Sequence, residues 1–210
     1  SYIINYEYDD GTETTGGTTS YNIEDVITLP KLEKEGWNFL YFEVSEIDES
    51  TNFTLGEHFQ EATIPAGKYG DVTLTAVWSA NEFGVSFNVQ HLTFEADTLT
   101  AIAGQNYTAT LIADEGYALP TSVLPTSVQV SINGDIVESG YSYTDGVITI
   151  SGNAIVGNIV ITASGTPKRF MVTLNLNDVS FDHGSIEANV DLENVHVNEN
   201  GEFELCLVSD

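Results

Sequence analysis

The chain has four histidines, the side chain used most often for metal binding and for proton transfer near neutral pH: His58, His91, His183 and His196. A helical zinc site needs two histidines four residues apart with a carboxylate beside them, as in the H-E-x-x-H pattern. No two of these histidines have that spacing, and the sequence repeat described below does not carry them at equivalent positions. We therefore predict solvent-facing loop histidines, no metal site and no cofactor.

Nucleophilic or cross-linking chemistry would have to use the one cysteine or the few lysines of the chain. Cys206 is alone, which excludes an internal disulfide, and no neighbouring histidine or basic residue would stabilise its thiolate. A Lys–Asn isopeptide bond needs a lysine buried within a strand, whereas the lysines here lie in predicted turns or linkers. They are Lys31, Lys34, Lys68 and Lys168. We predict a packed or half-exposed strand cysteine and no isopeptide bond.

Carboxylates are abundant, and their densest clusters are residues 9–13 and 46–49. Neither cluster has the D-x-[DN]-x-[DN]-G spacing that places alternate oxygens around one calcium ion, so we predict solvated loop carboxylates. A carboxylate pair for glycoside hydrolysis stays open as an alternative, because distance along the sequence says nothing about distance in space. Small repeated units without an evident cleft favour a protein that is not an enzyme, with no catalytic residues.

Tyr141 and Tyr143 are the residues that we single out as binding candidates. They flank a predicted hairpin and lie on one face of it, because side chains two positions apart on a strand point the same way. An exposed tyrosine offers both an apolar ring and a hydroxyl group to a sugar or a protein. Cross-strand packing is the other interpretation of this pair, and we favour it.

The net charge of the chain is strongly negative: 5 basic residues stand against 32 acidic ones, which gives −27. Such a surface repels phosphate backbones and anionic lipids, so we predict neither nucleic acid nor a membrane as a partner. The acidity serves solubility and mutual repulsion on a crowded surface. No run of 18 apolar residues is present, and the chain starts at Ser1 without a leader, so we expect a processed or excised piece.

Any site in this chain would have to be positioned by strands. The clearest strand pattern is in residues 70–78, and it recurs later in the chain. In residues 70–78 the side chains of Val72, Leu74, Ala76 and Trp78 alternate with hydroxyl groups, which predicts a strand with one apolar face. A close copy begins at residue 157, 87 positions after residue 70. The repeat continues further on: residues 172–182 match 85–95 at the same interval, and residues 202–210 match 106–114 after a nine-residue insertion.

These intervals predict a mainly β protein made of tandem small β modules, with little or no helix, arranged as an elongated rod. The modules are residues 1–80, residues 83–167, and residues 169–210 as the first half of a further copy. Asn133-Gly134 and Asp145-Gly146 predict tight hairpins, since these residues accept positive φ. We expect roughly one strand over residues 92–102, a linker at 166–169, and residues 57–62 as the one stretch of the first module that could form a helical turn.

The first 79 residues resemble the Listeria–Bacteroides repeat, also called the internalin B-repeat. The matching segments are Tyr2-Ile3-Ile4-Asn5-Tyr6, Asp10-Gly11, Tyr21-Asn22-Ile23-Glu24-Asp25, Ile27-Thr28-Leu29-Pro30, Glu35-Gly36-Trp37-Asn38-Phe39, Ile64-Pro65-Ala66-Gly67 and the strand from Gly70 to Trp78. One departure is Leu40-Tyr41-Phe42, where the family shows a Gly followed by Trp; Phe42 can fill the same apolar slot. Residues 83–167 and the partial copy look like divergent B-repeat-like modules of Gram-positive surface proteins.

The resemblance implies a β-grasp-like first module, an extracellular protein that is secreted or attached to the cell wall, and no shared catalytic residues. We therefore expect a monomeric structural stalk or adhesion segment that spaces a recognition module away from a bacterial cell, with a host protein or glycan bound through the full-length protein. A module that binds protein or glycan through exposed aromatics is the first alternative. A strand-complemented structural subunit of a fibre or phage is the second, because the third copy lacks its second half.

Overall fold

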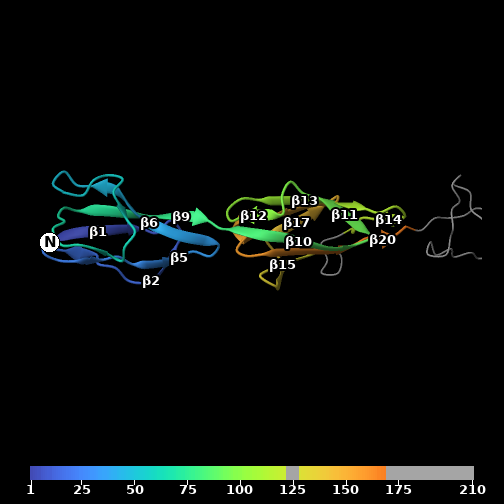
Figure 1. Ribbon diagram of the computed structural model, residues 1–210, viewed down its shortest axis with the longest axis horizontal. Helices are drawn as coiled ribbons and strands as arrows, with labels where there is room; N and C mark the ends of the chain where they lie inside the picture. Colours follow the sequence, from blue (N-terminus) through green and yellow to red (C-terminus); the bar gives the residue numbers. More distant parts are fainter. Residues whose placement is uncertain (122–127, 169–210) are drawn as a thin grey trace, which may run out of the picture.

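The computed structural model of the 210-residue chain describes residues 1–121 and 128–168 (Figure 1). Within these ranges the chain is built from strands, and the one helical element is the short 3-10 turn Gly152–Ala154. The prediction of a mainly β protein with little or no helix is confirmed. Residues 57–62 form no helical turn, because β7 (His58–Phe59) pairs there with β6 (Trp37–Ile47). The predicted third module, with Cys206, lies outside the described residues.

The first unit, as we call residues 1–80, is organised around a five-stranded sheet. Besides β6 and β7, its strands are β1 (Tyr2–Glu7), β2 (Thr12–Thr15), β3 (Ser20–Tyr21), β4 (Ile27–Thr28), β5 (Lys31–Glu33), β8 (Thr63–Ile64) and β9 (Val72–Ala80). The sheet has the order β3-β1-β9-β6-β7, with β1 and β9 parallel at its centre. β2 pairs with β5, and β4 pairs with β8, outside this sheet. The β-grasp-like assignment of this unit stays a prediction.

The second unit, as we call residues 82–121 and 128–168, has two larger sheets. The first has the order β12 (Thr100–Ile102), β10 (Glu82–Gln90), β19 (Ile159–Ser164), β15 (Val128–Ile132) and β16 (Asp135–Val137). The second has the order β11 (Leu92–Glu95), β13 (Tyr107–Ala113), β18 (Val147–Ile150) and β17 (Tyr141–Thr144). As in the first unit, a central pair is parallel, here β10 with β19.

Two of the expected strand boundaries in the second unit are wrong. The single strand expected over residues 92–102 is divided into β11 and β12, because residues 96–99 carry the chain from one sheet to the other. Part of the expected linker at 166–169 is a strand, since β20 (Thr166–Pro167) pairs with β14 (Tyr117–Ala118). Both hairpin predictions are confirmed: Asn133-Gly134 joins β15 to β16, Asp145-Gly146 joins β17 to β18, and all four residues have positive φ.

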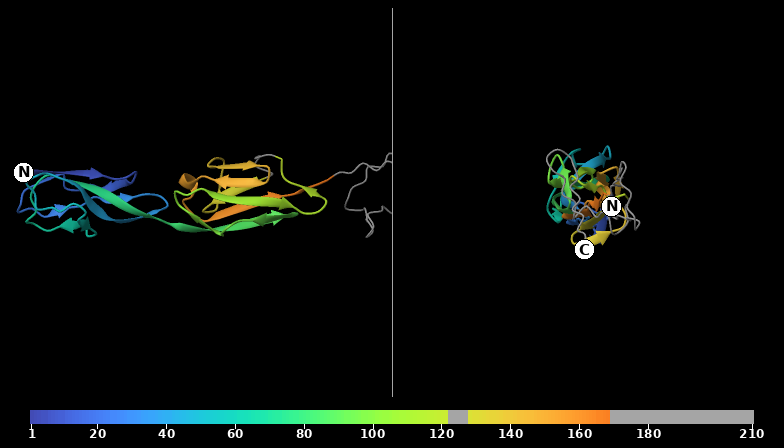
Figure 2. Two further views of the ribbon diagram at one scale, coloured as in Figure 1. Left: turned by 90° about the horizontal axis from the view of Figure 1, so that it is seen from above. Right: turned by 90° about the vertical axis from the view of Figure 1, so that its right-hand side faces the viewer.

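All buried apolar residues of the described ranges except Ala103 form two clusters, one in each unit. The largest fully buried side chains of the first unit include Tyr21, Phe42 and Leu74, and Trp78 packs against their cluster. In the second unit they include Leu111, Ile148 and Ile161. Figures 1 and 2 show the two groups of strands following one another along the longest axis of the structure. Each unit therefore has a core of its own.

Candidate functional site

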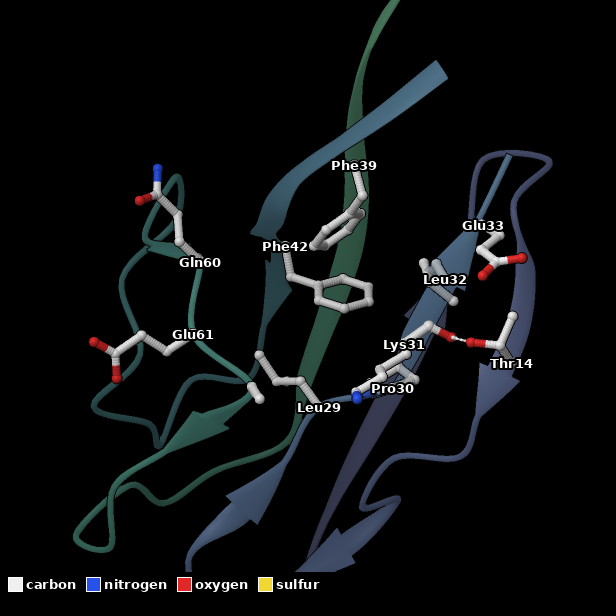
Figure 3. A pocket seen from close by; sticks show the side chains of 11 residues that line it. Thr14, Leu29, Pro30, Lys31, Leu32, Glu33, Phe39, Phe42, Gln60 and Glu61 are labelled. Carbon is white, nitrogen blue, oxygen red and sulfur yellow. Dashed lines mark hydrogen bonds between the residues drawn. The ribbon is translucent and has the colours of Figure 1, made fainter. Parts of the chain in front are cut away.

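A pocket of about 330 Å³ opens in the first unit between β5 and the segment that follows β7. Figure 3 shows Phe39 and Phe42 at its back, with Leu29 and Pro30 from the connection between β4 and β5 and Leu32 from β5. The remaining lining residues are Thr14, Lys31, Glu33, Gln60, Glu61 and Ala62. An apolar floor with a polar rim is the ordinary form of a binding site for a small ligand or a single inserted side chain.

A β-bulge in β6 gives this pocket its aromatic floor. The register of β6 against β9 shifts between Phe39 and Tyr41, so that Phe39 and Phe42 point to the same face of the sheet. Their ring centroids lie 5.1 Å apart, and Phe39 also meets the edge of Trp78 at 5.4 Å. Phe42 is buried in the core of the first unit, whereas Phe39 is half-buried and reaches the pocket.

The polar rim of the pocket does not hold two carboxylates that face each other. None of the lining residues is Ser, Cys or His, and the Thr14 hydroxyl donates to the Lys31 carbonyl oxygen at 3.2 Å. Glu33 and Glu61 come from opposite walls, but Figure 3 shows the Glu61 carboxylate pointing away from the pocket. A glycosidase needs two carboxylates that face each other across the substrate. The geometry of this pocket fits binding.

The sequence-derived binding candidates do not form a surface site. Tyr143 is only 8% exposed and pairs across the hairpin with Ile148, and burial raises the pKa of its phenol. Tyr141 is half-buried, packs against the same core, and donates its hydroxyl to the Val128 carbonyl oxygen at 3.4 Å. Both rings therefore have the packing role that we favoured, and Tyr143 is not available to a surface ligand.

The described histidines are exposed, as expected, and each is stacked on a tyrosine ring. His58 lies 4.0 Å from the ring of Tyr41 and hydrogen-bonds the Glu43 carboxylate at 2.8 Å. Its place in strand β7 differs from the expected loop position. His91 stacks on Tyr117 at 4.0 Å. His183 and His196 lie outside the described residues. Within the described ranges, no three His, Cys, Asp or Glu side chains gather as a metal site would require.

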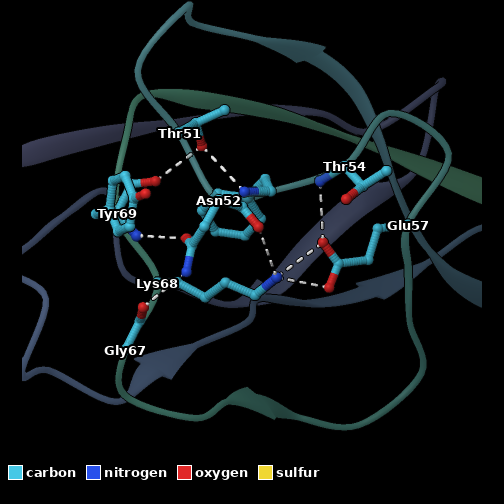
Figure 4. Close-up of polar contacts among 8 residues, drawn as sticks. Thr51, Asn52, Thr54, Glu57, Gly67, Lys68 and Tyr69 are labelled. Atoms are coloured by element: carbon cyan, nitrogen blue, oxygen red, sulfur yellow. Dashed lines mark hydrogen bonds and ion pairs between the residues drawn. The ribbon is translucent and has the colours of Figure 1, made fainter.

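Lys68 lies between Gly67 and Gly70 in a segment for which we predicted a turn. Its side chain is more buried than that prediction implies. Its Nζ lies 2.6 Å and 2.8 Å from the two Glu57 carboxylate oxygens and 4.7 Å from the centre of the Phe53 ring (Figure 4). Its contact with Asn52 is to the backbone carbonyl oxygen at 3.5 Å, while the Asn52 side chain bonds the backbones of Gly67 and Tyr69. This network ties residues 51–57 to residues 67–69. Lys68 forms an ion pair here, and the absence of an isopeptide bond stays a prediction.

The acidic clusters lie partly in turns and partly on strands, since Glu13 belongs to β2 and Glu46 to β6. Asp9 and Asp10 both have positive φ, and the Asp9 carbonyl oxygen accepts a hydrogen bond from Lys34 Nζ at 2.9 Å. Tyr8 donates its hydroxyl to Glu13 in the same cluster. In the second cluster, Asp48 accepts from the Glu49 backbone N–H at 3.0 Å. The carboxylates of both clusters are exposed, as expected, but Glu13 and Glu46 lie on strands, so the expected loop position is wrong for these two.

The sequence placed a module boundary between residues 80 and 83, but it did not indicate the contacts that join the two units there. β9 and β10 are separated by one residue, Asn81. Its backbone N–H donates to the Gly36 carbonyl oxygen of the first unit at 3.0 Å, and its own carbonyl oxygen accepts from the Ala103 N–H of the second unit, also at 3.0 Å. Its side chain accepts a hydrogen bond from Asn38. Asn81 is thus bound to both units at once.

Close packing surrounds this connection. Gly36 and Gly104 both have φ of +80°, and a Cβ on Gly104 would lie 2.9 Å from Cζ2 of Trp37. A Cβ on Gly36 would lie 3.0 Å from the Ile155 carbonyl oxygen of the second unit. Lys34 Nζ lies 4.6 Å from the centre of the Trp37 ring. The glycines therefore let a loop of the first unit touch the second directly.

No protein-family model matches this chain, and neither a curated protein nor a solved structure matches it. The resemblance to the Listeria–Bacteroides repeat accordingly stays a prediction from the sequence. In the part of the chain that the structure describes, no helix has the length and apolar character needed to cross a membrane.

Proposed function

We propose that this chain is a structural stalk segment of a bacterial cell-surface or secreted protein, where it spaces a recognition module away from the cell. The junction at Asn81 is the observation that carries the proposal. A spacer works only if its units keep their relative direction, and a flexible linker would let them fold back on one another. A one-residue connection with both backbone groups bonded to opposite units removes most of that freedom.

The surface charge supports the same role. The first unit carries three lysines among a large excess of carboxylates, and two of them, Lys34 and Lys68, are engaged with aromatic rings and acidic loops. The remaining surface is acidic, which keeps neighbouring copies apart on a crowded cell. Together these features describe a segment that holds distance and does not self-associate.

Distance measurements between the two units test the proposal. Spin labels at Ala66→Cys and Glu115→Cys, in a Cys206→Ser background, occupy exposed positions in the first and second units. A stalk segment gives one narrow distance distribution, and insertion of Gly-Gly-Ser after Asn81 broadens it. Trp37→Ala should broaden it partly, whereas Leu40→Ala, an exposed residue on the same strand, should leave it unchanged. A native distribution as broad as that of the insertion variant refutes the proposal.

A binding module is the second candidate, and the pocket lined by Phe39 is the observation that favours it. The half-buried ring could receive an apolar group or the face of a sugar, with Lys31 and Glu33 bonding polar groups at the rim. Titration of the isotope-labelled chain with an oligosaccharide and peptide panel would then shift the amide signals of residues 29, 31–33 and 60–62. Unchanged signals across the panel remove this candidate and leave the stalk proposal untouched.

A further inference from the structure

The strands through which the chain enters and leaves each unit lie side by side and run parallel. In the first unit β1 pairs with β9, in the register Ile4 to Val72 through Glu7 to Thr75. In the second unit β10 pairs with β19, in the register Val85 to Ile159 through Gln90 to Ser164. A parallel arrangement places the start of one strand and the end of the other at opposite ends of the pair.

These pairs lie on one continuous path along the molecule. Figure 1 shows β9 of the first unit leading directly into β10 of the second along the longest axis. Tension applied to the two ends of the described chain would therefore enter at β1, leave at β9, cross Asn81, enter at β10 and leave at β19. No long loop intervenes between β9 and β10 to absorb extension.

Tension along this path would slide the strands of each pair past one another. The hydrogen bonds of a ladder run across the strands, so a load along the strands stretches all of them together. A load that pulls both strands apart from the same end breaks them one after another. The first geometry resists far more force than the second, because several bonds must fail in a single step.

A side-chain hydrogen bond extends each ladder at the end where the load enters. The Ile3 backbone N–H donates to Asp71 Oδ1 at 2.8 Å, and the Gly84 backbone N–H donates to Asn158 Oδ1 at 2.9 Å. Asp71 and Asn158 are each the residue directly before β9 or β19. They are also equivalent positions of the 87-residue sequence repeat, so both copies carry an oxygen acceptor at this point.

We propose that the β1–β9 and β10–β19 pairs are mechanical clamps, with Asp71 and Asn158 as side-chain latches, that let this chain carry tensile force along its length. The inference goes beyond the stalk proposal, because keeping a distance under compression or thermal motion requires no resistance to pulling. It also does not depend on the stiffness of the junction at Asn81. Failure of one proposal is therefore distinguishable from failure of the other.

Single-molecule force spectroscopy on the full chain in two pulling directions tests the clamp. Handles at the two termini, in a Cys206→Ser background, load β1 and β9 in opposite directions. Handles at residue 1 and at Ala66→Cys load the same two strands from their common end, because both strands start there. We expect the unfolding force of the first unit to be at least about twofold higher in the first direction. Equal forces in the two directions overturn the proposal.

Matched substitutions then test the latches. Asp71→Ala and Asn158→Ala should each speed unfolding about tenfold at constant force in the unit that carries the change, which corresponds to one lost hydrogen bond. Asp71→Asn and Asn158→Asp keep an oxygen acceptor and should retain most of the native force. An unchanged rate in the alanine variants, or an equal loss when the strands are pulled from their common end, overturns the latch role. The comparison of pulling directions on the chain with native latches stands even where a variant fails to fold.

Discussion

Replacing Tyr21 with phenylalanine should destabilise the first unit near neutral pH, and this loss should shrink as the pH rises. The Tyr21 side chain is 2% exposed, and its hydroxyl donates to the Gly70 carbonyl oxygen at 2.6 Å. Burial first, then the negative charge of Asp71 and the neighbouring Tyr2, raises the pKa of Tyr21 from 10.0 to about 12. The Tyr21 phenol is therefore neutral and hydrogen-bonded in the folded chain near neutral pH.

The size of the effect follows from these values. Near pH 8 the variant loses one hydrogen bond and leaves the Gly70 carbonyl oxygen without it, which costs about 1–3 kcal/mol. A raised pKa in the folded state gives stability that is complete below pH 10 and is lost as the pH rises towards the folded pKa. With folded and unfolded pKa values near 12 and 10, the wild-type chain loses about 1.4 kcal/mol by pH 11. Phenylalanine cannot ionise, so the variant is spared this loss.

Urea unfolding at pH 8 and pH 11, monitored by tryptophan fluorescence, measures the free energy of unfolding of the wild type and of Tyr21→Phe. Trp78 packs against the core of the first unit, whereas Trp37 also meets Gly104 of the second unit, so a Trp37→Phe background makes the signal report on the first unit. The two proteins differ only at this hydroxyl, so the change in their stability difference between the two pH values reports on Tyr21 and the groups that it contacts. We expect the stability gap between the wild type and Tyr21→Phe to narrow by about 1.4 kcal/mol between the two pH values. A gap that stays constant would refute the reasoning.

The remaining predictions concern the two cores and one turn. Ile161→Ala should destabilise the second unit by about 2–5 kcal/mol, since the side chain is fully buried. In a Trp37→Phe background it should leave the transition detected by Trp78 fluorescence unchanged, and circular dichroism and fluorescence followed together check this. Phe42→Ala should cost about 3–5 kcal/mol and move the fluorescence transition itself, which a urea titration shows. Asn133→Ala, at φ of +53°, should cost about 1–2 kcal/mol in thermal unfolding, whereas Asn133→Gly should be nearly neutral; equal melting of both variants would contradict this.

Local patterns predicted the elements of this fold well, because they depend on neighbouring residues. Alternation of apolar and hydroxyl side chains indicated β9 and β19, and positive-φ dipeptides indicated the hairpins at Asn133 and Asp145. The division of residues 92–102 was missed because the pattern fits one strand as well as two. Only the pairing of β11 with β13 and of β12 with β10 decides it.

The pocket and the junction could not be predicted, because each depends on residues far apart in the sequence. The pocket needs the bulge near Leu40, which turns Phe39 towards residues 60–62. The junction needs Trp37 to meet Gly104, and neither residue type indicates such a contact. The repeat did mark Asp71 and Asn158 as equivalent, but their hydrogen bonds to Ile3 and Gly84 follow only from the parallel register.

Residual dipolar couplings measured separately for the two units test the stalk account most directly. If Asn81 and the contacts around Gly36 and Gly104 hold the units in one orientation, backbone N–H couplings from both units fit a single alignment tensor of equal magnitude. Two tensors that differ in magnitude or direction would show that the units reorient independently, and this result would contradict the account.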